Sequence, residues 1–282
     1  MKPARAALIG ALHAPAELLP VSSSAHVALA QGDEEDPELR KAFEIAVHAG
    51  TAAALVVALR GEVAEAVGGL DARRVALLAG SLLPPAVAGL ALERRIEQRL
   101  GTAPTTAAGL TVGALGMWWA DSRAQREGWA GFSSTDREKA ADPTRRREDA
   151  GLVDGLLLGL AQTAALWPGV SRAGATLAVL RARGYSRADA GVLSRHVALP
   201  VIAGATALKG ARLARRGLER RHRAALATGT TAAFAATLAS IPLVAPSSRH
   251  PRESPPLWPF ALYRLLLAAA LLRRATGENR KP

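Results

Sequence analysis

Several apolar stretches of this chain are long enough to cross a lipid bilayer, and they restrict its possible folds more than any other feature. Residues 75–92, 100–120 and 224–248 contain no Asp, Glu, Lys or Arg, and residues 42–59 contain only Glu44. At the rise of an α-helix, each stretch spans roughly 30 Å of hydrocarbon. A soluble Ala-rich helical protein would fit the modest mean hydropathy of +0.11. Soluble helices, however, carry a polar stripe that these stretches lack, so the pattern predicts an all-α polytopic membrane protein.

The composition narrows the classes of partner. The 282 residues have a formal net charge of +12, but only 4% are aromatic, and no basic patch is interleaved with aromatic residues. We therefore expect the lipid bilayer as the environment and no nucleic acid as a partner. The absence of cysteine excludes disulfides and thiolate metal sites. The N-terminal segment runs into Glu17 and a serine cluster instead of a small-residue cleavage site, so we expect it to be retained.

The two halves of the sequence resemble each other. Residues 121–150 form the longest charged stretch and predict a solvated linker between half-repeats at 1–120 and 151–282 of a single integral membrane domain. A shift of 149 positions places Gly10 on Gly159, Ala16 on Ala165, Val21 on Val170 and Ser22 on Ser171. In each half a long apolar helix is expected to follow, beginning near Ala42 and near Ala188. Repeated halves with interrupted helices are a common way for membrane proteins to build a polar site.

The first interrupted segment, "LLPVSSSAH" at 18–26, follows His13 and Glu17. Helical spacing places these two residues on one face, four positions apart. Pro20 breaks the helix, so the serines are expected on a turn with free backbone N–H groups. An ionisable group inside a membrane is costly and marks a functional site by default. The candidate polar residues of this segment are His13, Glu17, Ser22, Ser23, Ser24 and His26. The serines have an alternative role as caps or backbone partners.

The second segment, "LWPGVSRAGAT" at 166–176, places a cation in an apolar run. The guanidinium fork of Arg172 suits phosphate oxygens, and a following helix N-terminus adds backbone donors. Pairing of Arg172 with Glu17 is an alternative, and the two roles are compatible. The candidate residues of this segment are Gln162, Ser171, Arg172 and Thr176, with Gly169 and Gly174 allowing close approach to a ligand.

The two segments predict one shared cavity, with Arg172 and Ser23 within reach of one diphosphate. A cation, hydroxyls, a carboxylate and imidazoles suit an anionic lipid headgroup. The corresponding chemistry is phosphoryl transfer or hydrolysis. These residues alone leave transport of an anionic substrate as an equal alternative.

At these residues the chain resembles the undecaprenyl-diphosphate phosphatases of the bacitracin-resistance family. The family motif E-G-x-x-E-F-L-P-[IV]-S-S-[ST]-G-H corresponds to HAPAELLPVSSSAH at 13–26. The motif A-L-x-P-G-x-S-R-S-G-A-T corresponds to ALWPGVSRAGAT at 165–176, and similarity continues at 43–50, 184–190 and 259–264. The resemblance implies hydrolysis of a polyprenyl diphosphate lipid in a bacterial cell membrane, which recycles the carrier lipid of cell-wall synthesis and gives bacitracin resistance. It also implies about six membrane helices plus two re-entrant helical hairpins in an inverted repeat.

The resemblance also assigns roles to the site residues. The family site corresponds to Glu17, Ser23, His26, Ser171, Arg172 and Thr176, with Ser22, Ser24 and Glu44 nearby, and Ser23 is the candidate nucleophile. A divalent cation, Mg²⁺ or Ca²⁺, is implied, with Glu17 as the candidate ligand. We add His13 to the catalytic candidates, and Gln162, Gly174 and His48 to the substrate-binding ones. The oligomeric state is open, and a homodimer is one possibility.

Several positions depart from the family pattern, including the stretch SRHVA at 194–198, where the family has S-F-L-L-A. His13 replaces its first glutamate, His48 replaces a glutamine, and Ala173 replaces a serine. An imidazole at position 13 removes a possible base or cation ligand but can still transfer protons near neutral pH. The histidines, His196 included, have two further interpretations: a transition-metal site, or packing residues. The His13 substitution also suggests an alternative function, a relative that binds or translocates a polyprenyl phosphate lipid without hydrolysing it.

Overall fold

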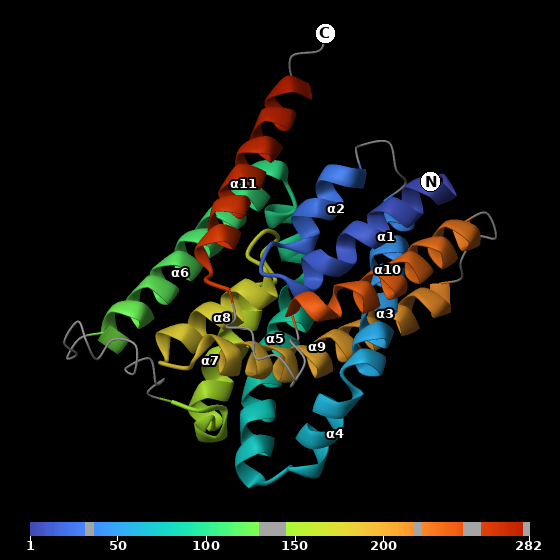
Figure 1. Ribbon diagram of the computed structural model, residues 1–282. Helices are drawn as coiled ribbons and strands as arrows, with labels where there is room; N and C mark the ends of the chain where they lie inside the picture. Colours follow the sequence, from blue (N-terminus) through green and yellow to red (C-terminus); the bar gives the residue numbers. More distant parts are fainter. Residues whose placement is uncertain (32–36, 130–144, 217–221, 245–254, 279–282) are drawn as a thin grey trace. The chain divides into compact units, whose positions relative to one another are not determined.

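The computed structural model describes residues 1–31, 37–129, 145–216, 222–244 and 255–278, and nearly all of these residues are helical (Figure 1). No strand occurs in these ranges. The helices are α1 (Pro3–Leu18), α2 (Ser23–Gln31), α3 (Pro37–Ala58), α4 (Arg60–Gly68), α5 (Ala72–Leu100), α6 (Ala103–Trp129), the 3-10 helix η1 (Arg147–Asp149), α7 (Leu152–Ala164), α8 (Arg172–Ala182), α9 (Arg187–Arg216), α10 (Arg223–Val244) and α11 (Trp258–Glu278).

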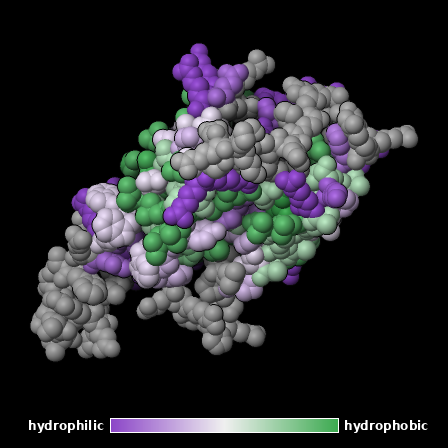
Figure 2. Space-filling model, turned by 90° about the horizontal axis from the view of Figure 1, so that it is seen from above, coloured by the Kyte–Doolittle hydropathy of each residue, from purple (hydrophilic) through white to green (hydrophobic). Residues whose placement is uncertain are grey.

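Four of the described helices are long and apolar enough to cross a membrane. These spans are Leu39–Ala58 of α3, Ala72–Leu92 of α5, Arg187–Arg212 of α9 and Arg223–Pro242 of α10. Helices α6 and α11, with 27 and 21 residues, are of similar length. Large apolar side chains are exposed on several helices, including Leu83 on α5 at 64% and Leu266 on α11 at 62%. Figure 2 shows such apolar side chains in green on the surface in view. Exposure of this kind suits contact with lipid, and the prediction of an all-α polytopic membrane protein is confirmed.

Two pairs of short helices correspond to the two interrupted segments. Helix α1 packs against α2, and α7 packs against α8. In the first pair, Leu19 has an extended backbone because Pro20 follows it, and the helix ends there as predicted. Among the described residues, Ser22 (φ 73°) and Ser171 (φ 62°) are the only non-glycine residues with a positive φ. Their shared left-handed backbone, which is uncommon for residues with a side chain, strongly supports the repeat.

The described residues form two compact units, and each combines segments from both halves of the sequence. Unit 1 comprises Met1–Leu19, Ser23–Gly68 and Ala198–Pro251, and in it α1 packs on α10. Unit 2 comprises Pro20–Ser22, Gly69–Val197 and Arg252–Pro282, and in it α7 packs on α5. Helices α1 and α7 correspond under the shift of 149 positions, and each packs on a helix from the other half of the sequence. The compact units therefore do not coincide with the half-repeats at 1–120 and 151–282.

Paired glycines permit both of these helix contacts. A Cβ on Gly10 of α1 would collide with the carbonyl oxygen of Gly229 in α10. A Cβ on Gly159 of α7 would collide with the carbonyl oxygen of Gly80 in α5. The shift of 149 positions that relates Gly10 to Gly159 also relates Gly80 to Gly229. The repeat thus preserves a tertiary contact as well as a local motif.

The variant Gly10→Ala is expected to lower the free energy of unfolding by about 1–3 kcal/mol, because the added methyl group forces α1 and α10 apart. The matched control is Gly61→Ala in α4, where an added Cβ meets nothing within 4 Å and alanine favours the helix. Thermal unfolding in detergent measures both variants. Equal unfolding midpoints for the two would contradict the close packing of α1 on α10.

The first part of the predicted linker at 121–150 belongs to a helix. Helix α6 continues to Trp129, and Asp121 is buried where it accepts hydrogen bonds from Arg181, Arg187 and the backbone of Leu257. Burial raises the pKa of Asp121, but the hydrogen bond from Arg187 and the other donors hold that pKa below its ordinary value. Asp121, at the start of this stretch, is therefore the buried centre of an ion-pair network instead of part of a solvated loop. Residues 130–144 lie outside the described residues.

Candidate functional site

The first hairpin brings a serine hydroxyl onto a carboxylate. Ser23, the first residue of α2, donates a hydrogen bond of 2.6 Å from Oγ to Oε2 of Glu17 in the last turn of α1. The helix break at Pro20 and the left-handed Ser22 allow the chain to reverse in four residues, which returns Ser23 to Glu17. A hydroxyl and a potential base at this distance form the arrangement required to activate a nucleophile.

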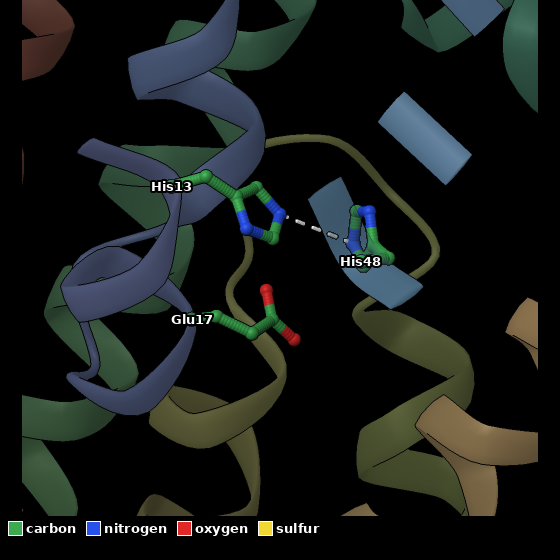
Figure 3. A group of neighbouring side chains, drawn as sticks. All are labelled: His13, Glu17 and His48. Atoms are coloured by element: carbon green, nitrogen blue, oxygen red, sulfur yellow. Dashed lines mark hydrogen bonds between the residues drawn. The ribbon is translucent and has the colours of Figure 1, made fainter. Parts of the chain in front are cut away.

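Two histidines lie beside this pair. His13 is fully buried one helical turn before Glu17, as the sequence spacing predicted. Its Nε2 atom lies 3.4 Å from Nε2 of His48 in α3, and the ring centroids are 4.3 Å apart. Figure 3 shows a ring nitrogen of His13 directed at His48, whose ring is steeply inclined to it, and the Glu17 carboxylate below His13. The side-chain ligand atoms of His13, Glu17 and His48 all lie within 4.8 Å of one another.

The Nδ1 nitrogens of both imidazoles contact neighbouring groups. Nδ1 of His48 lies 2.7 Å from the carbonyl oxygen of Glu44, and Nδ1 of His13 lies 3.4 Å from Oγ1 of Thr51. A carbonyl oxygen only accepts, so His48 carries its proton on Nδ1 and, when neutral, has a lone pair on Nε2. Thr51 is fully buried and also accepts a hydrogen bond from Thr237 of α10. These contacts orient the two rings with their Nε2 atoms toward each other.

The other candidates of the first segment differ in exposure. Ser22 is buried, His26 is partly buried and Ser24 is exposed at the start of α2. The carboxylate of Glu44 is exposed on α3, and the described contact of this residue with the cluster is made by its backbone carbonyl. The roles of these four residues stay predictions.

The second hairpin places its cation at the N-terminus of α8. The Oγ atom of Ser171 accepts a hydrogen bond from the backbone N–H of Gly174 and caps the helix, which begins at Arg172. The shift of 149 positions relates Arg172 to Ser23, the first residue of α2. The two hairpins therefore offer a cation and a hydroxyl at equivalent positions, each after a serine with a left-handed backbone.

Three further candidates from the second half have packing contacts. Thr176 is buried and lies 2.7 Å from the hydroxyl of Ser194, and it donates to the carbonyl oxygen of Arg172. Gln162, the repeat partner of His13, donates to the carbonyl oxygen of Ser81 in α5. Gly174 has no room for a Cβ because Arg264 and Met117 lie against it. Thr176 and Gly174 thus support the N-terminal turn of α8, and any contact of these three with substrate stays a prediction.

The structure adds Arg264 of α11 to the residues that shape the second hairpin. This fully buried guanidinium donates from Nη2 to the carbonyl oxygens of Gly169 at 2.7 Å and Val170 at 2.8 Å, directly before the Ser171 cap. No described carboxylate binds Arg264, so its charge is stabilised by carbonyl dipoles. Its position in the apolar run PFALYR at 259–264 was a signal that sequence reasoning did not use.

Replacing Arg264 with methionine is expected to lower the free energy of unfolding by about 1–3 kcal/mol, because buried carbonyls of the α7–α8 turn lose their donor. The exposed Arg273 of the same helix is the matched control. The thermal unfolding midpoints of Arg264→Met and Arg273→Met in detergent measure the difference. A midpoint for Arg264→Met no lower than that of Arg273→Met would show that Arg264 does not stabilise the turn.

The prediction of one shared cavity concerns residues of different units. Ser23, Glu17 and the two histidines belong to unit 1, whereas Ser171, Arg172 and Thr176 belong to unit 2. Within unit 1, the structure brings together a serine hydroxyl, a carboxylate and two imidazoles. Within unit 2, it places a cation on a helix N-terminus. The joining of these two groups into a single cavity stays a prediction.

Comparisons with known proteins agree with this geometry. The chain is 34% identical over 280 residues to undecaprenyl-diphosphatase of Geobacter sulfurreducens, covering 95% of this chain and 96% of the relative. It is 34% identical to undecaprenyl-diphosphatase 1 of Rhodospirillum rubrum, covering 92% and 90%. It is 33% identical to undecaprenyl-diphosphatase of Chromohalobacter salexigens, covering 91% and 92%. The model of the family described as bacitracin resistance protein BacA matches residues 6–270, so the chain belongs to this family of multi-pass membrane proteins.

Proposed function

We propose that this protein hydrolyses undecaprenyl diphosphate to undecaprenyl phosphate and inorganic phosphate in the bacterial cell membrane. The observation that carries the proposal is the 2.6 Å hydrogen bond from the Ser23 hydroxyl to the Glu17 carboxylate. The names of the relatives supply the substrate, since all three are undecaprenyl-diphosphatases. Such a reaction recycles the carrier lipid of cell-wall synthesis, and bacitracin resistance is the associated phenotype.

The proposed chemistry has two steps. Ser23 Oγ attacks the terminal phosphorus, the bond from that phosphorus to the bridging oxygen breaks, and undecaprenyl phosphate leaves. Glu17 accepts the hydroxyl proton from Oγ during the attack. The proton passes from Glu17 to the departing lipid phosphate, which leaves Glu17 ionised again. Water then attacks the phosphoserine as Glu17 takes a proton from it, the bond from phosphorus to Ser23 Oγ breaks, and the proton passes from Glu17 to Oγ, which releases inorganic phosphate and restores the serine. Glu17 thus has the position to serve in both steps.

Arg172 is proposed to bind the phosphate oxygens. A guanidinium presents paired donors that match two oxygens of one phosphate, and the N-terminus of α8 adds a favourable dipole. Charge on the transferred phosphoryl group is spread over its oxygens in the transition state. The fork of Arg172 would therefore stabilise the reacting group more than a point charge does.

The divalent cation expected from the resemblance can be compared with the donors near Glu17. Mg²⁺ and Ca²⁺ prefer oxygen ligands such as carboxylates and carbonyls. The side chains gathered here are one carboxylate and two imidazoles, from Glu17, His13 and His48. Since nitrogen ligands favour transition metals, this donor set does not fit Mg²⁺ or Ca²⁺, and no step of the proposed chemistry depends on either ion.

Phosphate release by the purified protein in detergent tests the proposal. Undecaprenyl diphosphate is expected to yield one phosphate per molecule, while undecaprenyl monophosphate yields none above background. Expression in a bacitracin-sensitive host should raise the tolerated bacitracin concentration. Tight binding of either lipid without phosphate release would refute hydrolysis. It would favour the second candidate, a relative that binds or translocates the lipid, which is suggested by the replacement of the family glutamate by His13.

A further inference from the structure

We propose that His13, Glu17 and His48 form a binding site for a borderline transition-metal dication, with Zn²⁺ as the ion that fits best. This inference deepens the proposed function, because Glu17 belongs to the proposed catalytic pair. All three residues lie in unit 1, so the site depends on no contact between the units. Two imidazoles and one carboxylate are a ligand set of catalytic zinc, which keeps its fourth position open.

The distance between the two imidazoles suits a shared ion. Two nitrogens that each lie about 2.0–2.1 Å from a tetrahedral zinc are about 3.3–3.4 Å apart. The Nε2 atoms of His13 and His48 are separated by 3.4 Å. A direct hydrogen bond between nitrogens at this distance is weak, since well-formed N–H donors lie at about 2.7–3.2 Å from their acceptors.

The surrounding contacts orient both rings for metal binding. Metal-binding histidines usually donate their second N–H to a carbonyl or another polar group, which fixes the tautomer. His48 does this through Nδ1 to the carbonyl oxygen of Glu44 at 2.7 Å. Nδ1 of His13 contacts the buried hydroxyl of Thr51 at 3.4 Å. With Nδ1 of each ring so engaged, the Nε2 atoms are the available ligands.

The carboxylate can serve the metal and the serine together. Oε2 of Glu17 accepts the hydrogen bond from Ser23, and a carboxylate has two oxygens, so one group can contact both the serine and an ion. Because the three ligand atoms lie within 4.8 Å of one another, a small movement of the Glu17 side chain would bring its carboxylate to an ion held by the two imidazoles. A bound zinc would act as a Lewis acid toward a phosphate oxygen of the substrate. The two histidines replace oxygen-bearing side chains of the family pattern, so this ion preference is expected to distinguish this chain.

Zinc binding is measured on full-length protein without a polyhistidine tag, stripped with a chelator in detergent and reloaded with Zn²⁺. Elemental analysis after desalting is expected to give one zinc per chain. The double variant His13→Glu/His48→Gln restores the family residues and removes both nitrogen ligands. Competition with a chromophoric chelator is expected to give this variant a Kd for Zn²⁺ about 100-fold higher than that of the wild type. Loading with Co²⁺ should give the intense visible bands of tetrahedral coordination in the wild type and not in the double variant.

The controls separate this site from other histidines and from misfolding. His222→Gln removes a histidine at the start of α10, outside the cluster, and should bind zinc like the wild type. The single variant His48→Gln, at a partly exposed position, should weaken zinc binding about tenfold or more. A wild type without zinc, or an equal Kd in wild type and double variant, overturns the site even if phosphate is released. Zinc binding without phosphate release supports the site and refutes the proposed function.

Discussion

Replacing Ser23 with alanine is expected to reduce the rate of phosphate release from undecaprenyl diphosphate about a thousandfold or more, since removal of a nucleophile typically has effects of this size. The hydroxyl oxygen lies 2.6 Å from Oε2 of Glu17, the proposed base. Ser24, the next residue, is exposed. The measurement is the single-turnover rate of phosphate release in detergent at saturating enzyme.

The matched control is Thr228→Ala, which removes an exposed hydroxyl from α10 that bonds only its own helix backbone. This variant should retain the wild-type rate. The thermal unfolding midpoint of Ser23→Ala should lie close to that of the wild type, because this partly buried position loses one hydrogen bond worth about 1 kcal/mol. A Ser23→Ala variant that still releases phosphate within a few fold of the wild-type rate would exclude Ser23 as the nucleophile.

Local sequence signals predicted the hairpins well. Pro20 fixed the end of α1 because proline prevents the preceding residue from continuing the helix. The match of Ser22 with Ser171 identified two positions that share a left-handed backbone. Helical spacing also placed His13 on the same face of α1 as Glu17. Each of these features depends on residues that lie close together in sequence.

Local sequence signals could not predict the long-range contacts. His48 lies 35 positions after His13, and no local spacing relates them. The buried Asp121 accepts hydrogen bonds from arginines of α8 and α9, at least 60 positions later in the sequence. No local signal indicates these partners, so a carboxylate in a charged stretch was expected to be solvated. Periodicity identifies an apolar helix but does not select its partner. The exchange of helices between the halves, α1 onto α10 and α7 onto α5, was therefore not predicted.

The variant Arg172→Lys is expected to lower kcat for phosphate release about 100- to 1000-fold, the usual cost of losing one preorganised donor to the transition state. Lysine keeps the positive charge but offers a point charge in place of the planar fork. The N-terminus of α8 is stabilised by the Ser171 cap, and the substitution leaves this cap in place. The thermal unfolding midpoint should consequently change little while kcat falls.

Two comparisons decide what Arg172 contributes. Arg273→Lys makes the same exchange at an exposed position of α11 and should behave as the wild type in both kcat and unfolding midpoint. Arg172→Ala should be slower than Arg172→Lys, because it removes charge as well as geometry. A fall in kcat with an unchanged KM would indicate donors that act mainly in the transition state, whereas a higher KM alone would indicate uniform binding of the phosphate. Wild-type turnover of Arg172→Lys would instead show that the planar fork is not required. Arg172 would then contribute only a positive charge at the helix N-terminus.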